Sequence, residues 1–409
     1  MKICLVSQEY PPETARGGIG SQTWNKARTL TAMGHTVFVV SASGRNDVET
    51  RAETHDGVFV RRIPTPGTAF LVYENPTYWV GYSWEVFREL RRLEREVHFD
   101  VIDFAEYGAE GFAYMLDRND WNRVPTVVQL HGPLSMFAAR IGWPEKDSDF
   151  SRVGSCMEQY CIQRADALMA CSANIADFTA KRHGVARDSI AVVHCGVDAE
   201  AFVGGRHRAE RPTILFVGEI AINKGVVTVF EAALRLRVRH PKLLLQILGK
   251  GADELVSDFR QRAAAAGAAD NVEFVGFVGR EQLPDFFRKA WVFASPAQHE
   301  VGVANVYIEA MASACPVVAA ISGAAKEAVE DGISGILVAP GDVEATTAAL
   351  DRILGSEKLR SAMGQQGRRR VEEYFAMDHY INRVLETYEC AIRVAREKLP
   401  RVSDQREIE

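Results

Sequence analysis

Two glutamates flank a glycine-bearing turn in the second half of the chain. The stretch SPAQHEVGVANVYIEAMA (295–312) follows an apolar run that predicts a buried strand, and it places Glu300 and Gly302 in a loop before a predicted helix. Asn305 is a suitable N-cap for that helix. The free N–H groups of a first helical turn and the positive end of the helix dipole form a site for an anion, most naturally a phosphate.

The two carboxylates could complete such a site. Glu309 lies about one turn inside the predicted helix, and helical side chains lean toward the N-terminus. Its carboxylate can accept two hydrogen bonds from a diol while the amides hold phosphate, a combination that suits a ribose diphosphate. Glu300 could accept hydroxyl groups beyond the phosphates. In the alternative interpretation, Glu309 is a helix-dipole acid and Glu300 a solvated loop charge. A glycosidase pair of carboxylates is disfavoured by the phosphate-type helix start.

A lysine marks a second predicted helix start. The stretch VGEIAINKGV (217–226) follows a strand pattern and places Lys224 where the next helix is expected to begin. There its cation adds to the positive end of the helix dipole, so two helix starts in one domain would converge on an anion. The alternative is an exposed surface lysine.

The first half of the chain offers two weaker signals. Gly17 and Gly18, in RGGIGSQTW (16–24), form a glycine-rich strand-to-helix loop that allows a ligand to approach the backbone closely, although a plain loop fits equally well. The loop lacks the G-x-G-x-x-G order of a dinucleotide site. His131 follows the strand pattern of PTVVQLHGP directly, where open α/β sheets bind ligands; a hydrogen-bonded structural histidine is the alternative.

The elements around these residues alternate between short apolar runs and helix-length segments, which predicts parallel strands joined by helical crossovers. The run KICLVS begins one such series, and strands at 213–217 and 243–248 begin a second. Residues 203–212, rich in glycine and charge, form a candidate linker. The pattern predicts two doubly wound α/β domains with a cleft at their strand carboxyl ends. Residues 373–398 predict a long helix that could cross back to the first domain.

Composition excludes several classes of protein. The net charge is −6 with acids and bases interspersed, which argues against a nucleic-acid partner. The seven cysteines are scattered without a C-x-x-C pair, as expected for reduced thiols in the cytoplasm and not for a disulfide framework or a zinc site. No signal-peptide core or membrane-spanning apolar run is found. In FRELRRLERE (87–96) acids dilute the basic charge, so a solvated helix face is favoured over peripheral membrane contact.

The combination of motifs resembles glycosyltransferase family 4, the retaining enzymes of GT-B fold. The resemblance covers nearly the whole chain and depends on the order and spacing of its fragments. These fragments are GGIG near the start, LHG at 130–132, ADALMACSANIADF at 165–178, HCGVDAEAF at 194–202, VGEIAINKG at 217–225, NVEFVGFV at 271–278, NVYIEAMASACPVVAA at 305–320 and KEAVEDGISGILVAPGD at 326–342.

The resemblance implies a reaction and a division of labour between domains. Residues 1–203 would bind the acceptor, residues 204–372 the nucleotide sugar, and residues 373–409 would form a helix that returns to the first domain. The implied co-substrate is a nucleoside-diphosphate sugar, with no required metal or other cofactor. The implied acceptor is a hydroxyl group of a saccharide, a lipid-linked saccharide or a small metabolite. Transfer would retain the anomeric configuration by a front-face displacement, so positioning and charge stabilisation would carry the catalysis.

The resemblance also assigns roles to individual positions. Glu309 would hold the ribose, Glu300 would face the sugar, Lys224 would neutralise the leaving diphosphate and His131 would lie near the transferred sugar. The implied catalytic set is His131, Lys224 and Glu300. The implied donor-binding set is Gly17, Gly18, Lys224, Val278, Gly302, Val303, Ala304, Asn305 and Glu309.

Two positions depart from the family pattern. Residues 301–308 separate Glu300 from Glu309, one residue more than the family has, so either a one-residue bulge keeps Glu300 in its role or the sugar contact is lost; we favour the bulge. Glu219 replaces an arginine that pairs with the family's lysine, and Arg16 is a candidate to compensate. These departures leave open a sugar-nucleotide epimerase or hydrolase, or a nucleotide-sugar-binding protein that has lost turnover.

Overall fold

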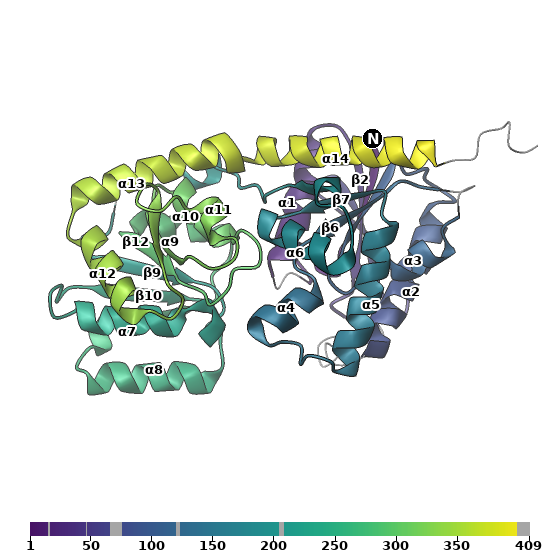
Figure 1. The fold of residues 1–409 in the computed structure, drawn as a ribbon. Coiled ribbons are helices and arrows are strands. Elements are labelled where there is room, and N and C mark those ends of the chain that lie inside the picture. Colours follow the sequence, from purple (N-terminus) through teal and green to yellow (C-terminus); the bar gives the residue numbers. More distant parts are fainter. Residues whose placement is uncertain (15–16, 46, 66–75, 120–122, 204–207, 399–409) are drawn as a thin grey trace, which may run out of the picture. The chain divides into compact units, whose positions relative to one another are not determined.

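The structure is a computed structural model that describes residues 1–14, 17–45, 47–65, 76–119, 123–203 and 208–398 (Figure 1). The chain divides into two compact units. The first comprises Met1–His194 together with the chain from Tyr380 onward, and the second comprises Cys195–His379. Each unit is built on its own sheet.

The first unit contains an eight-stranded sheet in the order β3-β4-β2-β1-β5-β6-β7-β8. Neighbouring strands are parallel except in the antiparallel pair β3–β4. The central strands read as unbroken apolar runs because helices cover both faces of such sheets. The strands are β1 (Lys2–Val6), β2 (Thr36–Ala42), β3 (Arg51–His55), β4 (Val58–Ile63), β5 (Val101–Ala105), β6 (Thr126–Leu130), β7 (Ala167–Ala170) and β8 (Ile190–Val192).

The helices of this unit follow its strands along the chain. They are α1 (Gly18–Ala32), α2 (Pro76–Leu93), α3 (Phe112–Asp117), α4 (Leu134–Ile141), α5 (Asp149–Arg164) and α6 (Ala173–His183), with a 3-10 turn at Arg187–Ser189. The chain returns to the unit through α14 (Met377–Glu397). A buried polar cluster fixes this return: the Lys26 ammonium lies 2.6 Å from Asp103 Oδ2, and the Tyr388 hydroxyl donates to the same oxygen at 2.6 Å.

The second unit contains a six-stranded parallel sheet in the order β11-β10-β9-β12-β13-β14. Its strands are β9 (Thr213–Val217), β10 (Leu244–Leu248), β11 (Val272–Gly276), β12 (Val292–Ser295), β13 (Val317–Ala320) and β14 (Gly335–Val338). Its helices are α7 (Val226–Leu236), α8 (Asp253–Ala265), α9 (Leu283–Lys289), α10 (Asn305–Ala312), α11 (Ala325–Ala328), α12 (Val343–Leu354) and α13 (Glu357–Arg370). Short 3-10 turns lie at Glu200–Phe202, Ile222–Lys224 and Ala269–Asn271.

The last helix begins later than the sequence predicts. The chain first makes a π-helical turn at Val371–Phe375, and Ala376 is extended, with φ −62° and ψ 149°, before α14 starts at Met377. The helical pattern from 373 therefore combines two segments that a non-helical residue separates. No helix among the described residues is both long and apolar enough to cross a membrane.

Candidate functional site

The strand order of the second sheet reverses between β9 and β12, which are paired in the middle of the sheet. In open α/β sheets a ligand binds at such a reversal, outside the strand carboxyl ends. The loop after β9 carries Lys224 and the loop after β12 carries Glu300. Hydrogen bonds join the two loops: Gln298 N–H donates to the Asn223 carbonyl at 2.9 Å, and the Ser295 hydroxyl donates to the Lys224 carbonyl at 3.3 Å.

Lys224 does not begin a helix, and this part of the sequence prediction is wrong. It ends a 3-10 turn, Gly225 follows in a left-handed conformation with φ 79°, and α7 begins at Val226. The glycine interrupts the helical path because a left-handed residue cannot continue a right-handed helix. Lys224 therefore lies just before the helix, where its charge acts on the carboxyl group of Glu300.

Glu300 is buried beneath this loop junction, with 7% of its surface exposed. Its backbone pairs with Gly323, and its carbonyl accepts a hydrogen bond from Ala324 N–H at 2.8 Å. Burial raises the pKa of Glu300, while the Lys224 charge and a hydrogen bond with Tyr307 oppose the rise. The Lys224 charge reaches the Glu300 carboxyl group, and the one-residue bulge that would keep Glu300 in the family's role stays a prediction.

Asn305 is not the N-cap of α10, which corrects the sequence prediction. Ala304 occupies that position in an extended conformation and supplies no side-chain cap, while Asn305 is the first helical residue. The Asn305 Oδ1 atom is buried without a hydrogen-bond partner among the described residues. A helix without a side-chain cap leaves its first N–H groups to other acceptors. The start of α10 therefore leaves its first N–H groups without a capping side chain, as an anion site requires.

Glu309 lies one turn into α10 and is 6% exposed. Burial raises the pKa of its carboxyl group, and Arg280 lowers it. Arg280 Nη2 lies 3.9 Å from Glu309 Oε1. Arg280 was not singled out from the sequence, because it approaches Glu309 from another loop, the one between β11 and α9. Val278 lies in that same loop, after the left-handed turn at Gly276 (φ 82°).

Glu219, the departure at the family's arginine position, is exposed in the loop after β9. The structure records no ion pair between Glu219 and another described residue. Arg16, the predicted compensating cation, lies outside the described residues.

His131 directly follows β6, as predicted. The backbone N–H of His131 donates to both carboxylate oxygens of the buried Glu106, at 2.7 Å each. The backbone N–H of Gly132 donates to the same carboxylate. Burial, aided by the Lys26 charge, lowers the pKa of His131 to about 3, so the imidazole is neutral near pH 7. Burial raises the pKa of Glu106 to about 7 despite these backbone hydrogen bonds. Sequence reasoning missed Glu106, although it follows the apolar strand β5 just as His131 follows β6.

The glycine loop of the first unit is held by another glutamate. Gly17, the N-cap of α1, donates its N–H to Glu9 Oε2 at 2.9 Å. A Cβ atom at Gly20 would lie 2.8 Å from Glu9 Cβ, whereas no atom lies within 4 Å of a Cβ built at Gly18. Gly18 is therefore the position of this loop with room for a ligand.

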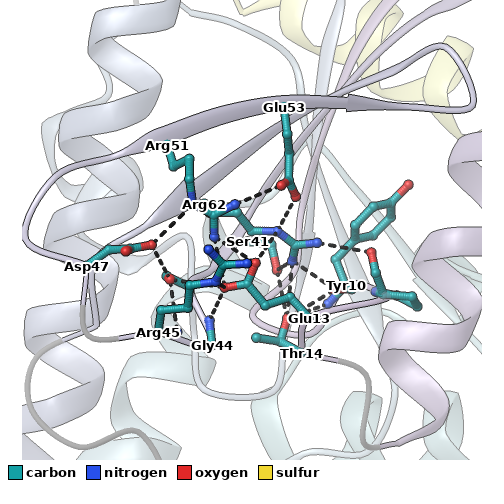
Figure 2. A network of polar contacts seen from close by, with 12 residues as sticks. Tyr10, Glu13, Thr14, Ser41, Gly44, Arg45, Asp47, Arg51, Glu53 and Arg62 are labelled. Carbon is teal, nitrogen blue, oxygen red and sulfur yellow. Dashed lines mark hydrogen bonds and ion pairs between the residues drawn. The ribbon is translucent and has the colours of Figure 1, made fainter.

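The start of the same loop is fixed by a charged network (Figure 2). The fully buried Arg62 of β4 donates to the Tyr10 carbonyl at 2.8 Å and to Glu53 at 2.7 Å. Glu13 accepts from Arg51 at 2.7 Å and from Gly44 N–H at 2.8 Å. The network ties the loop after β1 to the end of β2 and to the β3–β4 hairpin. This hairpin was not predicted from the sequence.

The two sheets define an α/β protein with two doubly wound units, and comparisons with known proteins specify the class. The family model described as glycosyltransferase family 4 matches residues 16–201, and the model described as glycosyl transferases group 1 matches residues 198–370. The chain belongs to glycosyltransferase family 4, with the GT-B fold, as its motifs predicted. It is a glycosyltransferase of a family that uses nucleotide-sugar donors.

Individual relatives agree with this assignment. Glycogen synthase of Mycobacterium tuberculosis H37Rv is 27% identical over 98% of each chain. D-inositol 3-phosphate glycosyltransferase of Geodermatophilus obscurus is 29% identical over 94% of this chain and 87% of the relative. Among solved structures, sucrose-phosphate synthase from Thermosynechococcus elongatus matches 95% of this chain and 98% of its own, with a TM-score of 0.80 and 19% identity. HepE of Anabaena in complex with UDP-glucose matches 95% and 99%, with a TM-score of 0.72 and 18% identity.

Proposed function

We propose that the chain is a retaining hexosyltransferase that transfers a sugar from a nucleoside-diphosphate sugar to a hydroxyl acceptor without requiring a metal ion. The single observation that carries the proposal is the junction at the reversal of the second sheet. There Lys224, buried Glu300 and the uncapped start of α10 are held together by hydrogen bonds between two loops. A glycogen synthase among the relatives supports a hexose as the transferred sugar.

Each part of this junction has a role in the proposed reaction. The first amides of α10 and the Lys224 ammonium would neutralise the diphosphate, whose negative charge grows as the bond to the sugar breaks. Glu309 would accept hydrogen bonds from the ribose hydroxyls, and Glu300 would orient the sugar. The backbone near Val278 would contact the base. No protein nucleophile is required, because the acceptor oxygen attacks the anomeric carbon on the face from which the diphosphate leaves.

The domain roles complete the proposal. Residues 204–372 would bind the donor and residues 1–203 the acceptor, with the C-terminal segment 373–409 returning to the first domain. His131, a neutral imidazole, would hydrogen-bond the transferred sugar, and the loop at Gly17 and Gly18 would approach the diphosphate. The acceptor is a saccharide, a lipid-linked saccharide or a small metabolite, and the proposed location is the cytoplasm.

Substitution of the donor-site residues tests the proposal. Lys224→Ala and Glu309→Ala should abolish transfer while the far-ultraviolet circular dichroism spectrum and the melting temperature stay close to those of the wild type. The matched controls are Lys242→Ala and Glu357→Ala, because both side chains are exposed in the same unit, outside the loops that follow β9 and β12. Full transfer activity in Lys224→Ala and Glu309→Ala would contradict the proposal. A product formed from the donor alone, without acceptor, would instead indicate an epimerase or a hydrolase.

A further inference from the structure

Arg280 lies in the loop between β11 and α9, with its guanidinium 3.9 Å from Glu309. Its side chain is 37% exposed, whereas that of Glu309 is 7% exposed. The Arg280 guanidinium has no other hydrogen bond or ion pair with a described residue. It is thus a cation at the accessible edge of a buried carboxylate.

Glu309 needs such a cation. A carboxylate removed from water tends to take up a proton, and a protonated carboxyl group must use one oxygen as a donor. A ribose diol offers two hydroxyl donors, which an ionised carboxylate can accept together. Burial therefore favours the protonated form of Glu309, whereas ribose binding uses the ionised form. The charge of Arg280 favours the ionised form, because it lowers the pKa of Glu309.

The distance between Arg280 and Glu309 leaves the Glu309 carboxylate free to bind a diol. At 3.9 Å the guanidinium is beyond hydrogen-bond range, so it acts on Glu309 by its charge. A bidentate arginine would occupy the two oxygens that the diol needs. The observed spacing stabilises the charge and leaves both oxygens available.

No other charged side chain on the elements around α10 replaces Arg280. These elements are α9, α13, the π-helical turn at Val371–Phe375 and β13, and β13 carries no charged residue. None of their described charged groups forms an ion pair with Glu309. Several are engaged elsewhere: Arg288 pairs with Asp285, Arg368 with Glu372 and Arg370 with Glu330.

We propose that Arg280 is a positioning residue for donor recognition, which keeps Glu309 ionised so that it can bind the ribose diol. The inference rests on the proposed function, because it takes Glu309 as the ribose ligand. Arg280 then sets both the affinity for the ribose and the lowest pH at which the donor binds.

Calorimetric titration with three probes tests this role. The probes are a nucleoside diphosphate that binds the wild type (UDP, ADP or GDP), its 2′,3′-dideoxy form and inorganic pyrophosphate. Arg280→Gln should weaken the ribonucleotide by about tenfold when binding is measured at a pH low enough for Glu309 of the variant to be largely protonated. Affinity for the dideoxy form and for pyrophosphate should stay unchanged. Arg280→Lys should restore most of the lost affinity.

The pH dependence gives an independent readout. Donor affinity should fall on acidification as Glu309 takes up a proton, and Arg280→Gln should move this fall to higher pH. The matched control is Arg239→Gln, which removes an exposed ion pair with Asp351 in the same unit. An unchanged ribonucleotide affinity and pH profile in Arg280→Gln would overturn the inference, as would an equal loss for pyrophosphate, which would show direct phosphate contact. If UDP, ADP and GDP all fail to bind the wild type, the result contradicts the proposed function itself, on which the role of Arg280 depends.

Discussion

A Cβ atom at position 225 would lie 2.3 Å from the carbonyl oxygen of Pro296. Gly225 precedes α7 and Pro296 follows β12, so this close approach joins the two loops that carry Lys224 and Glu300. The contact is between backbones, and neither partner can move aside as a side chain would. A glycine at this position therefore determines how closely the lysine and the glutamate approach each other.

We expect Gly225→Ala to lower stability and donor binding together. A left-handed alanine costs about 1–2 kcal/mol, and the overlap with Pro296 requires the loops to separate as well. Gly341→Ala is the matched control, because Gly341 has φ 73° but no atom within 4 Å of a built Cβ. Gly341→Ala should lower the melting temperature by a few degrees and leave nucleotide affinity intact. Equal affinities in the two variants would show that the loop contact does not position the site.

Glu300→Gln should separate stability from activity. Burial raises the pKa of Glu300, so the folded protein holds its proton more tightly than the unfolded chain does. The tighter proton binding stabilises the folded protein at low pH. This stabilisation is lost as the pH rises from about 4.5, the ordinary pKa of a glutamate, through the higher pKa of Glu300 in the folded protein. The glutamine variant should therefore gain in melting temperature relative to the wild type as the pH rises toward 7. Its kcat should fall by about 100-fold or more if Glu300 orients the sugar.

The measurement is a pair of melting curves between pH 4 and pH 8, with kcat measured at pH 7. Glu357→Gln serves as the control, since Glu357 is an exposed glutamate of the same unit. Full activity in Glu300→Gln would exclude a role for Glu300 in the reaction, whatever the stability of that variant.

The fold could be predicted because its strands and crossovers leave a local pattern. Strands such as β1 and β13 are buried on both faces and appear as short apolar runs between helix-length segments. The β3–β4 hairpin escaped prediction because charged residues (Arg51, Glu53 and His55) alternate along β3 with Ala52 and Thr54, and because Arg61 and Arg62 interrupt the apolar pattern of β4.

The site was predictable where its chemistry is local. Glu300 and Glu309 lie on one strand-loop-helix segment, so their spacing alone predicts that they belong to one site. The helix start predicted at 224 was too early, because the left-handed Gly225 interrupts the helix and α7 begins at Val226. The helix predicted near 305 does begin at Asn305, and only its N-cap was wrong, because Ala304 occupies that position without a capping side chain. Arg280 contacts Glu309 from a separate loop, and the local sequence pattern does not indicate which loops meet. Glu106 follows β5 as His131 follows β6, so its position at the end of a strand was the signal that could have found it.

His131 should make the first unit sensitive to acid. Its folded pKa of about 3 lies below the ordinary 6.5, so the unfolded chain takes up a proton that the folded protein excludes. Stability should fall as the pH drops from 6.5 toward 3. Glu106, with a pKa raised to about 7, has the opposite effect, because it stabilises the folded protein as the pH falls. The contribution of His131 to stability must therefore be measured as a difference between the wild type and a His131 variant.

The variant for this comparison is His131→Asn. Relative to the wild type, its melting temperature should rise as the pH falls from 6.5 to 4, because the asparagine does not titrate. His55→Asn is the control, since the His55 side chain is partly exposed on the β3–β4 hairpin. A pH-independent difference between wild type and His131→Asn would contradict a neutral imidazole at position 131.

Tyr388 should determine how firmly α14 is attached to the first unit. Its hydroxyl donates to the Asp103 oxygen that also meets Lys26, and all three side chains are buried. A hydrogen bond to a charged group contributes about 1.5–3 kcal/mol, so Tyr388→Phe should lower the melting temperature by several degrees. Lys26→Met should be more damaging, at about 3–5 kcal/mol, because it leaves the Asp103 carboxylate buried without its cation. Tyr374→Phe, at a half-exposed tyrosine of the second unit, should change the melting temperature little. Amide hydrogen exchange along residues 380–397 provides the local measurement: Tyr388→Phe should accelerate exchange there, and unchanged protection would mean that apolar packing alone holds the helix.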